Sequence, residues 1–271
     1  MKRDKLLASI VLAVFLIAAP ASAALTVSGS TTVMPLGERC AEEFNDVQSE
    51  IEVSVTGGGS GVGIKNIAEG ISNIAMASRQ VKDAEKETYG DDFVEFLIAY
   101  DAVCIAVSQE IYDAGVTELS QDDVAAIYNG EITNWEDVGG PDEEIYVLAR
   151  LAGSGTRDTF NKMVMGSDEA ETLGVRTYHG SNAEIKSTIT GSDKAIGYLG
   201  LSYVQDDIEV ISYEGVEPSA ETIQDGSYPL ARALYMYTFG EPSEDAQAFL
   251  DFVMSEDGQT VAEDEGFVPA Y

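Results

Sequence analysis

The sequence of 271 residues contains one histidine, two cysteines and one tryptophan. Because His179 is the sole histidine, a metal cluster of His and Cys ligands is poorly supplied, and a Ser-His-Asp triad has a single candidate base. We interpret His179 as a structural or surface residue and expect neither a metal nor a cofactor. The sequence also lacks the Gly-x-Ser-x-Gly turn of hydrolases and the Gly-Lys-Ser/Thr of P-loop proteins. These absences argue against an enzyme.

Positive charge is scarce as well, with 15 Lys and Arg against 48 Asp and Glu and a formal net charge of −33. Proteins bind nucleic acid largely by neutralising its phosphates with Lys and Arg, so we expect no nucleic-acid partner. The same excess of acid repels small anions at long range. Any anion site in this chain must therefore depend on local backbone dipoles and on a few arginines.

The two cysteines, Cys40 and Cys104, each lie in an apolar, patterned segment. A disulfide and two buried free thiols are both compatible with these positions.

Segment 241–271 has apolar residues at helical spacing, which predicts helices. Trp135 is interpreted as a packing residue beneath the turn 132–134. We expect a monomer.

Long hydrophobic runs are absent apart from residues 6–19, which follow a basic start and precede a small-x-small pattern ending at Ala23. This run of 14 residues is short of the roughly 20 that a spanning helix needs. We therefore interpret residues 1–23 as a signal peptide, which places the protein outside the cytoplasmic membrane, in the periplasm, at the cell surface or secreted. An uncleaved membrane anchor is the alternative.

Strand-like apolar runs alternate along the chain with helix-like amphipathic runs, which predicts an α/β fold with mostly parallel strands. The length suits one large domain or two lobes. The predicted strands are 51–55, 93–100, 103–107, 145–149 and 208–212, and the predicted helices are 33–44, 61–68, 121–128, 156–164, 183–189 and 245–254.

Three glycine-rich turns, 28–32, 57–63 and 153–157, each lie between a predicted strand and a predicted helix. A helix N-terminus presents free backbone N–H groups and the positive end of the helix dipole, so it favours an anion. Ser154 and Thr156 add hydroxyl groups, and Arg150 precedes the third turn. Because ligands in α/β sheets bind beyond the carboxyl ends of the strands, the three turns predict one shared site for a tetrahedral oxyanion.

Several short sequence strings of this chain resemble strings of the phosphate-binding proteins of phosphate ABC transporters and occur in the same order as in that family. The resemblance extends over essentially the whole chain after residue 23. The resemblance implies a two-lobed periplasmic-binding-protein fold of type II, a Venus flytrap, and an ABC permease as partner. Lobe one would comprise residues 25–98 and 230–271, and lobe two residues 99–229, with hinges near 99–101 and 228–232. The strings are 29–36, 57–63, 76–79, 127–140, 150–157, 196–198 and 228–232.

The resemblance also implies a set of phosphate ligands, and two departures from the family pattern complicate it. Where relatives have carboxylates that accept the phosphate proton and partner the arginine, this chain has Arg79 and Ala152. We interpret Arg79 as a second guanidinium on the ligand and Asp101 either as the acceptor or as a structural hinge carboxylate. The implied ligands are Ser30, Thr31, Thr32, Ser60, Ser78, Arg79, Arg150, Ser154, Gly155 and Thr156.

Three readings of function follow from these residues. The first is a receptor for phosphate, with sulfate or another tetrahedral oxyanion as a variant, because a site of donors without an acceptor would not discriminate between them. The second is a secreted enzyme acting on phosphoesters with Ser154 or Ser60 as nucleophile, for which no base is assigned. The third is a surface protein that keeps the fold without the binding.

Overall fold

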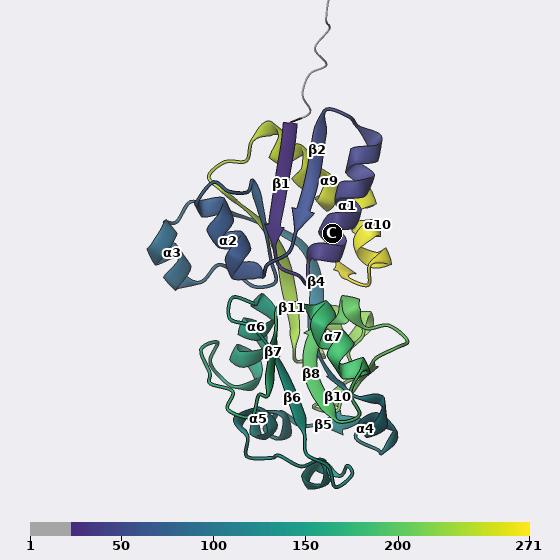
Figure 1. The fold of residues 1–271 in the computed structure, drawn as a ribbon. Coiled ribbons are helices and arrows are strands. Elements are labelled where there is room, and N and C mark those ends of the chain that lie inside the picture. Colours follow the sequence, from purple (N-terminus) through teal and green to yellow (C-terminus); the bar gives the residue numbers. More distant parts are fainter. Residues whose placement is uncertain (1–22) are drawn as a thin grey trace, which may run out of the picture.

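A computed structural model of the protein describes residues 23–271, so the expected signal peptide lies outside the described residues except for its last position. Figure 1 shows two lobes, one above the other, connected by the strands β4 (Phe93–Val107) and β11 (Ala231–Phe239). This is the α/β architecture of a type II periplasmic-binding protein. The segments expected to act as hinges lie on β4 and at the start of β11.

Lobe one contains the beginning and the end of the described chain, because helices α9 and α10 pack beside α1 in the upper lobe. Its other elements lie before the crossing strand β4. The elements of lobe one are β1 (Ala23–Gly29), α1 (Met34–Val47), β2 (Ile51–Thr56), α2 (Ser60–Ala68), β3 (Ile74–Ala77), α3 (Asp83–Tyr89), α9 (Glu244–Met254) and α10 (Glu256–Asp264).

Lobe two is formed by the chain between the two crossing strands. Strand β12 (Val268–Pro269) lies further along the chain and pairs with β4. The elements of lobe two are α4 (Gln109–Asp113), β5 (Glu118–Leu119), α5 (Gln121–Asn129), the 3-10 helix Trp135–Val138, β6 (Tyr146–Arg150), α6 (Gly155–Val164), β7 (Thr177–His179), α7 (Asn182–Thr190), β8 (Ala195–Gly200), the 3-10 helix Leu201–Tyr203, β9 (Glu209–Val210), β10 (Ser212–Tyr213) and α8 (Ala220–Gln224).

The main sheet runs through both lobes in the order β2-β1-β3-β11-β4-β8-β6-β7. The strands within each lobe, β2-β1-β3 and β8-β6-β7, pair in parallel, as the sequence predicts. The crossing strands instead pair antiparallel with each other and with their neighbours β3 and β8. The reason is connectivity, because β4 carries the chain into lobe two and β11 carries it back.

The sequence predicts two strands, 93–100 and 103–107, where the structure has the single 15-residue strand β4. Asp101 interrupts the apolar pattern and suggests a break. In the structure Asp101 stays in the strand because Arg232, directly opposite on β11, supplies a counter-charge. A paired carboxylate can be buried within a continuous strand where an unpaired one could not.

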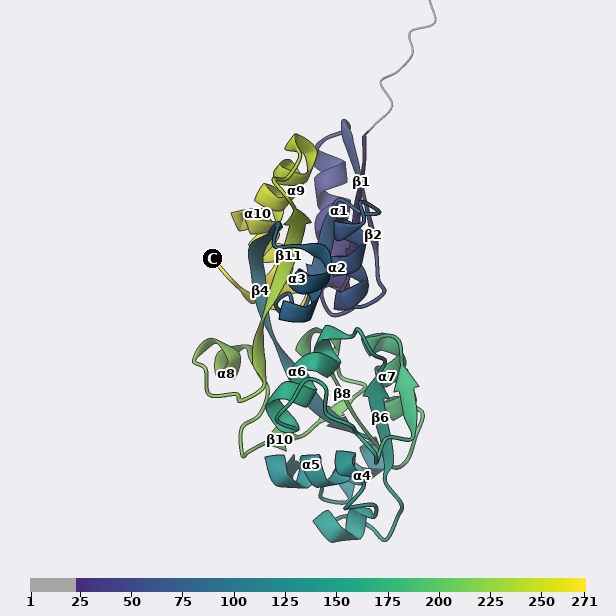
Figure 2. The ribbon, with the colours of Figure 1, turned by 90° about the vertical axis from the view of Figure 1, so that its left-hand side faces the viewer.

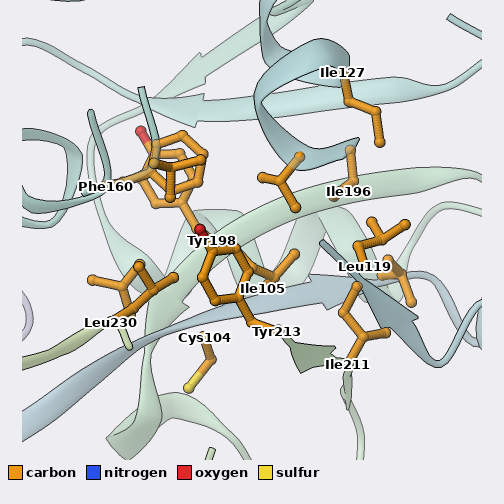
Figure 3. Close-up of a cluster of buried hydrophobic side chains, with 14 of the residues drawn as sticks. Cys104, Ile105, Leu119, Ile127, Phe160, Ile196, Tyr198, Ile211, Tyr213 and Leu230 are labelled. Carbon is orange, nitrogen blue, oxygen red and sulfur yellow. The ribbon is translucent and has the colours of Figure 1, made fainter. Parts of the chain in front are cut away.

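Each lobe has its own hydrophobic core, and the core of lobe two positions the elements that carry Arg150 and the start of α6. The rings of Phe160 on α6 and Tyr198 on β8 stack with their centroids 4.1 Å apart. Both side chains are labelled in Figure 3. The hydroxyl of Tyr198 accepts a hydrogen bond of 3.2 Å from the backbone N–H of Arg150. Trp135 is fully buried in the same core, in the packing role expected from the sequence.

The structure decides between the two alternatives for the cysteines. Cys40 and Cys104 are free thiols in the cores of different lobes, and Cys104 is visible in Figure 3. Burial raises the pKa of the Cys40 thiol to about 12, and burial also raises the pKa of Cys104. Both groups are therefore uncharged at neutral pH and act as small apolar side chains.

Candidate functional site

Four helices begin at the junction between the lobes, each after a strand that ends there. Helices α1 and α2 belong to lobe one, and Figure 2 shows α6 and α7 at the end of lobe two that faces it. Ser154 caps α6 by accepting a hydrogen bond from the backbone N–H of Arg157, and Ser181 caps α7 in the same way through Glu184. The three predicted turns therefore lie close together at this junction, and a fourth turn, residues 180–182, lies beside them.

Arg150, at the end of β6, is the centre of the contacts between the lobes. Its Nη2 donates to the Thr31 hydroxyl of lobe one at 2.9 Å and to the carbonyl oxygen of Gly180 at 2.8 Å. Its Nη1 donates to Oδ1 of Asn182 at 2.9 Å. The guanidinium is thus held in one orientation at the point where the turns meet.

The hydroxyls of the first and third turns meet directly. Thr32 Oγ1 and Thr156 Oγ1 lie 2.8 Å apart across the two lobes, and Asn182 Nδ2 donates to Thr32 Oγ1 at 3.0 Å. The hydroxyl of Tyr203 donates to the backbone oxygen of Thr31 at 2.6 Å. All of these groups except Tyr203 are buried, so the lobes are closed on a polar interface shielded from water.

The second turn meets the third through Ser60, Ser78 and Gly155. The backbone N–H of Ser78 donates to Ser60 Oγ at 3.1 Å, and the two hydroxyl oxygens lie 3.4 Å apart. A Cβ atom added to Gly155 would lie 2.5 Å from Ser78 Oγ and closer still to Ser60 Oγ. The absence of a side chain at Gly155 therefore permits the close approach of the two lobes at this point.

A backbone hydrogen bond supports the same approach, since the N–H of Gly61 in lobe one donates to the oxygen of Gly153 in lobe two at 3.0 Å. Ser30 is buried in the first turn, where its Oγ accepts from the N–H groups of Thr32 and Val33 at 3.2 and 3.4 Å. The structure thus brings together the positions expected from the sequence in all three turns, with Ser30 directed at its own turn.

Arg79 is placed differently from the expectation that it acts as a second guanidinium on the ligand. Its Nε donates to Asp158 at 2.7 Å, and its Nη1 and Nη2 each donate to Glu85 at 2.8 Å. Two carboxylates therefore neutralise this guanidinium beside the site. The sequence could not show this, because Asp158 becomes a neighbour only when α6 packs against the turn after β3.

Asp101 is fully buried on β4, and both of its oxygens are occupied. Its Oδ2 accepts from Nε and Nη2 of Arg232 at 3.1 and 2.7 Å, and its Oδ1 accepts from the N–H of Leu201 at 2.9 Å. Of the two roles left open by the sequence, the hinge carboxylate is the one these contacts describe. The contacts leave the role of acceptor untested.

The electrostatics of Arg150 are unusual for a buried guanidinium. Its partners are the neutral groups of Thr31, Asn182, Gly180 and His179, and within residues 24–271 no carboxylate forms an ion pair with it. Burial lowers the pKa of Arg150 to about 10, and the positive charge of Arg232 contributes in the same direction. A buried charge without a counter-ion is costly, so this site favours a bound anion.

Two residues of this site, Asn182 and Arg232, were not among the ligands expected from the sequence. Asn182 could have been found, because residues 180–182 form another strand-to-helix turn of the same composition as the three recognised. Arg232 could not have been placed at the site from its sequence neighbours, because only the pairing of β11 with β4 brings it beside Thr32.

Neither candidate nucleophile has a base in reach. Ser60 Oγ contacts Ser78, and Ser154 Oγ accepts from a backbone N–H, so among the described residues no His or carboxylate is positioned to deprotonate either serine.

In the part of the chain that the structure describes, no three His, Cys, Asp or Glu side chains form a metal-binding group. Across residues 23–271, no helix is both long and apolar enough to cross a bilayer.

Comparison with known proteins gives matches along nearly the whole chain. A family described as the PBP superfamily domain matches residues 17–257. The phosphate-binding protein PstS of Bacillus subtilis (strain 168) is 36% identical over 255 residues, which cover 92% of this chain and 81% of that protein. The phosphate-binding protein PstS of Borreliella burgdorferi is 32% identical over 254 residues, 90% of this chain and 89% of that protein.

Solved structures give the same result. A structure from Clostridium perfringens, described as a phosphate ABC transporter substrate-binding protein with bound phosphate, superposes with a TM-score of 0.85 at 34% identity and covers 92% of this chain and 100% of that one. An ABC-type phosphate transport receptor from Vibrio cholerae superposes with a TM-score of 0.73 at 30% identity, covering 90% and 99%. The similarity therefore extends over both lobes.

Proposed function

Because this chain belongs to the PBP superfamily and, within it, to the family of phosphate-binding proteins PstS, we propose that it captures inorganic phosphate between its lobes and delivers it to an ABC permease. The observation that carries the proposal is Arg150, a buried guanidinium whose partners are all neutral. A phosphate anion supplies the missing counter-charge. The protein acts as a receptor and not as an enzyme, as its phosphate-binding relatives do.

The donors to the anion come from both lobes, so the complete set of contacts forms only when the lobes close on the anion. Lobe one contributes the first two turns and the N-termini of α1 and α2, and lobe two contributes Arg150 and the N-terminus of α6. Local dipoles and one guanidinium act within a few ångströms, where they outweigh the long-range repulsion of the acidic surface. The proposed phosphate ligands are Ser30, Thr31, Thr32, Ser60, Ser78, Arg150, Ser154, Gly155 and Thr156.

Selectivity for phosphate over sulfate requires an acceptor for the proton of hydrogen phosphate, since sulfate carries no proton at neutral pH. We assign this role to the carboxylate of Asp101, because its partner Arg232 also donates to the hydroxyl of Thr32 at 3.3 Å. A buried carboxylate acceptor would repel sulfate and leave groups unpaired. Asp101 is therefore our candidate for the residue that discriminates between the two anions.

The proposed cellular role follows from the family and from the N-terminus. Residues 1–23 export the chain as a signal peptide, and the mature protein works outside the cytoplasmic membrane as a monomer. Its partner is the membrane permease of an ABC transporter, which receives phosphate when the lobes open. Mass spectrometry of the N-terminus of the exported protein tests this assignment, since a cleaved chain begins at Ala24 or Leu25 and an anchored chain retains residues 1–23.

Isothermal titration of the purified protein, freed of bound anion by unfolding and refolding, tests the binding directly. We expect a dissociation constant for phosphate in the micromolar range or below and no heat with sulfate. Arg150→Ala should weaken phosphate binding by a few kcal/mol, because it removes a buried charged donor to an anion. Arg176→Ala is the matched control in the same lobe, since the Arg176 side chain is 56% exposed and pairs with Glu144 at the surface.

Each alternative predicts a different experimental result. Equal affinities for phosphate and sulfate would indicate a general receptor for tetrahedral oxyanions. Unchanged phosphate affinity in Arg150→Ala would contradict the receptor and favour a protein that keeps only the fold. Hydrolysis of a chromogenic phosphate ester that disappears in Ser154→Ala would restore the enzymatic reading.

A further inference from the structure

Arg232, the second residue of β11, is a buried arginine with an unused donor. Its side chain is 4% exposed, and its Nε and Nη2 atoms both donate to Oδ2 of Asp101, whose side chain is fully buried. Its Nη1 atom is enclosed, and no hydrogen-bond acceptor among the described residues contacts it. A guanidinium donor that is shielded from water and unpaired carries a substantial free-energy cost, so a partner is expected.

The unused donor lies beside the anion site. Nη2 of Arg232 donates to the Thr32 hydroxyl at 3.3 Å, and that hydroxyl also contacts Thr156 and Asn182. Because Nη1 and Nη2 are bonded to the same carbon atom, Nη1 lies within one guanidinium width of Nη2 and so on the same side of the junction as Thr32. One cavity between the lobes is lined by both Arg232 and Ser78, so hollow space adjoins Arg232 and the start of the segment that follows β3.

A glycine permits the close packing of Asp101, Arg232 and Thr32. A Cβ atom at Gly200 on β8 would lie 3.0 Å from Oδ2 of Asp101, 3.0 Å from the methyl carbon of Thr32 and 3.5 Å from Nη2 of Arg232. A larger residue would separate the Asp101–Arg232 pair from the first turn. The fold thus holds the pair against Thr32.

The positive charges of Arg232 and Arg150 also repel each other. Burial lowers the pKa of Arg150, and the charge of Arg232 lowers it further. Two buried guanidinium groups that repel one another are stabilised by an anion that both contact. Asp101 already neutralises one of the two positive charges. The remaining charge attracts an anion.

We propose that Arg232 is a second guanidinium ligand of the bound anion, contacting it through Nη1 while Asp101 holds it in place. This inference rests on the proposed phosphate-binding function, and it assigns to Arg232 the role that the sequence suggested for Arg79. Because Arg232 lies on the strand that returns from lobe two to lobe one, its contact with the anion joins the binding site to the crossing strands.

The test compares Arg232→Met, Asp101→Asn and the double variant Asp101→Asn/Arg232→Met by phosphate titration at pH 7, with the unfolding midpoint of each protein measured in parallel. A ligand contact predicts that Arg232→Met weakens phosphate binding about ten- to a hundredfold. It also predicts that the double variant binds phosphate more weakly than Asp101→Asn alone, since the loss of the Asp101 carboxylate is common to both proteins. An affinity of the double variant equal to or above that of Asp101→Asn would show that Arg232 serves only as the partner of Asp101.

Two further variants separate the failure of this inference from the failure of the proposed function. If the wild type binds phosphate and Arg150→Met does not, the proposed function stands, and unchanged affinity in Arg232→Met then overturns the role of Arg232 alone. If the wild type shows no phosphate binding, the proposed function itself fails. Should Arg232→Met not fold, Arg232→Lys retains a cation beside Asp101, and a loss of about tenfold or more with an unchanged unfolding midpoint supports the inference.

Discussion

Nε of Arg79 in lobe one donates a hydrogen bond of 2.7 Å to Oδ2 of Asp158 in lobe two, and both side chains are about nine-tenths buried. Lys82 of lobe one contacts Asp158 at 3.1 Å and Asp168 at 2.8 Å, so the cations of one lobe face the carboxylates of the other. Because the partners belong to different lobes, we expect opening of the lobes to break these contacts. They stabilise the closed form without touching the proposed phosphate ligands themselves.

Arg79→Gln should therefore weaken phosphate binding through the closure equilibrium. We expect a loss of about 1–2 kcal/mol, roughly five- to thirtyfold, because an ion pair that forms on closure is removed. The loss should be larger for Asp158→Asn, because that change also removes a partner of Lys82. The losses should be less than additive in the double variant, since both changes break the Arg79–Asp158 pair. Titration calorimetry of the three proteins measures these losses, and fully additive losses would show that Arg79 acts independently of Asp158.

Arg150→Met should make the phosphate-free protein more stable while abolishing binding. The pKa of about 10 for folded Arg150 lies below its ordinary value, mainly because of burial. The folded state therefore disfavours the charged form, and this penalty is fully present below pH 10 and disappears as the pH rises from there towards the ordinary pKa of arginine. After allowance for lost hydrogen bonds, we expect the free energy of unfolding at pH 7 to rise by about 1 kcal/mol.

Urea unfolding in phosphate-free buffer checks the sign of this change. Added phosphate should raise the unfolding midpoint of the wild type by mass action and leave that of Arg150→Met unchanged. A variant that is destabilised by more than about 2 kcal/mol would indicate that the contacts of Arg150 with Thr31 and Asn182 contribute more than its charge costs.

Gly155→Ala should prevent closure, because the new methyl group would overlap the hydroxyls of Ser60 and Ser78. Those serines belong to lobe one and Gly155 to lobe two, so the clash can be relieved by opening the lobes without unfolding either core. We expect phosphate affinity to fall more than about a hundredfold, a loss of roughly 3 kcal/mol. Small-angle scattering should show an open form with phosphate present.

Gly191→Ala is the matched control for this substitution. Gly191 follows α7 with a φ of −94°, which any residue adopts, and a Cβ atom there would approach no atom closer than 3.1 Å. Its phosphate affinity should equal that of the wild type. A closed, phosphate-binding Gly155→Ala would show that the lobes tolerate a side chain at the contact point.

Asn182→Asp should weaken phosphate binding more than Asn182→Ala. The alanine variant loses the amide that orients Arg150 and donates to Thr32, for which we expect about a tenfold loss. The aspartate variant adds a negative charge beside Arg150, which neutralises the guanidinium and repels the anion. Titration of both variants at pH 7 distinguishes this role from simple packing, which predicts similar affinities for the two.

Local chemistry along the chain was sufficient to predict several features of this protein. The alternation of apolar strands and amphipathic helices indicated the α/β fold, and the strings resembling one family indicated its two-lobed form. The three glycine-rich turns with Arg150 indicated an oxyanion site, because a helix N-terminus and its turn are formed by neighbouring residues. These features depend on short stretches of sequence, so sequence alone can determine them.

Tertiary structure decided which charges reach the site. Arg79, next to Ser78 in sequence, is neutralised by Glu85 and Asp158, whereas Arg232 arrives beside Thr32 from 200 residues further along the chain. Asp101 is paired with Arg232 because β11 places that arginine opposite it. The partner of a buried charge is set by strand register and lobe packing, and neither is readable from the residues that flank it.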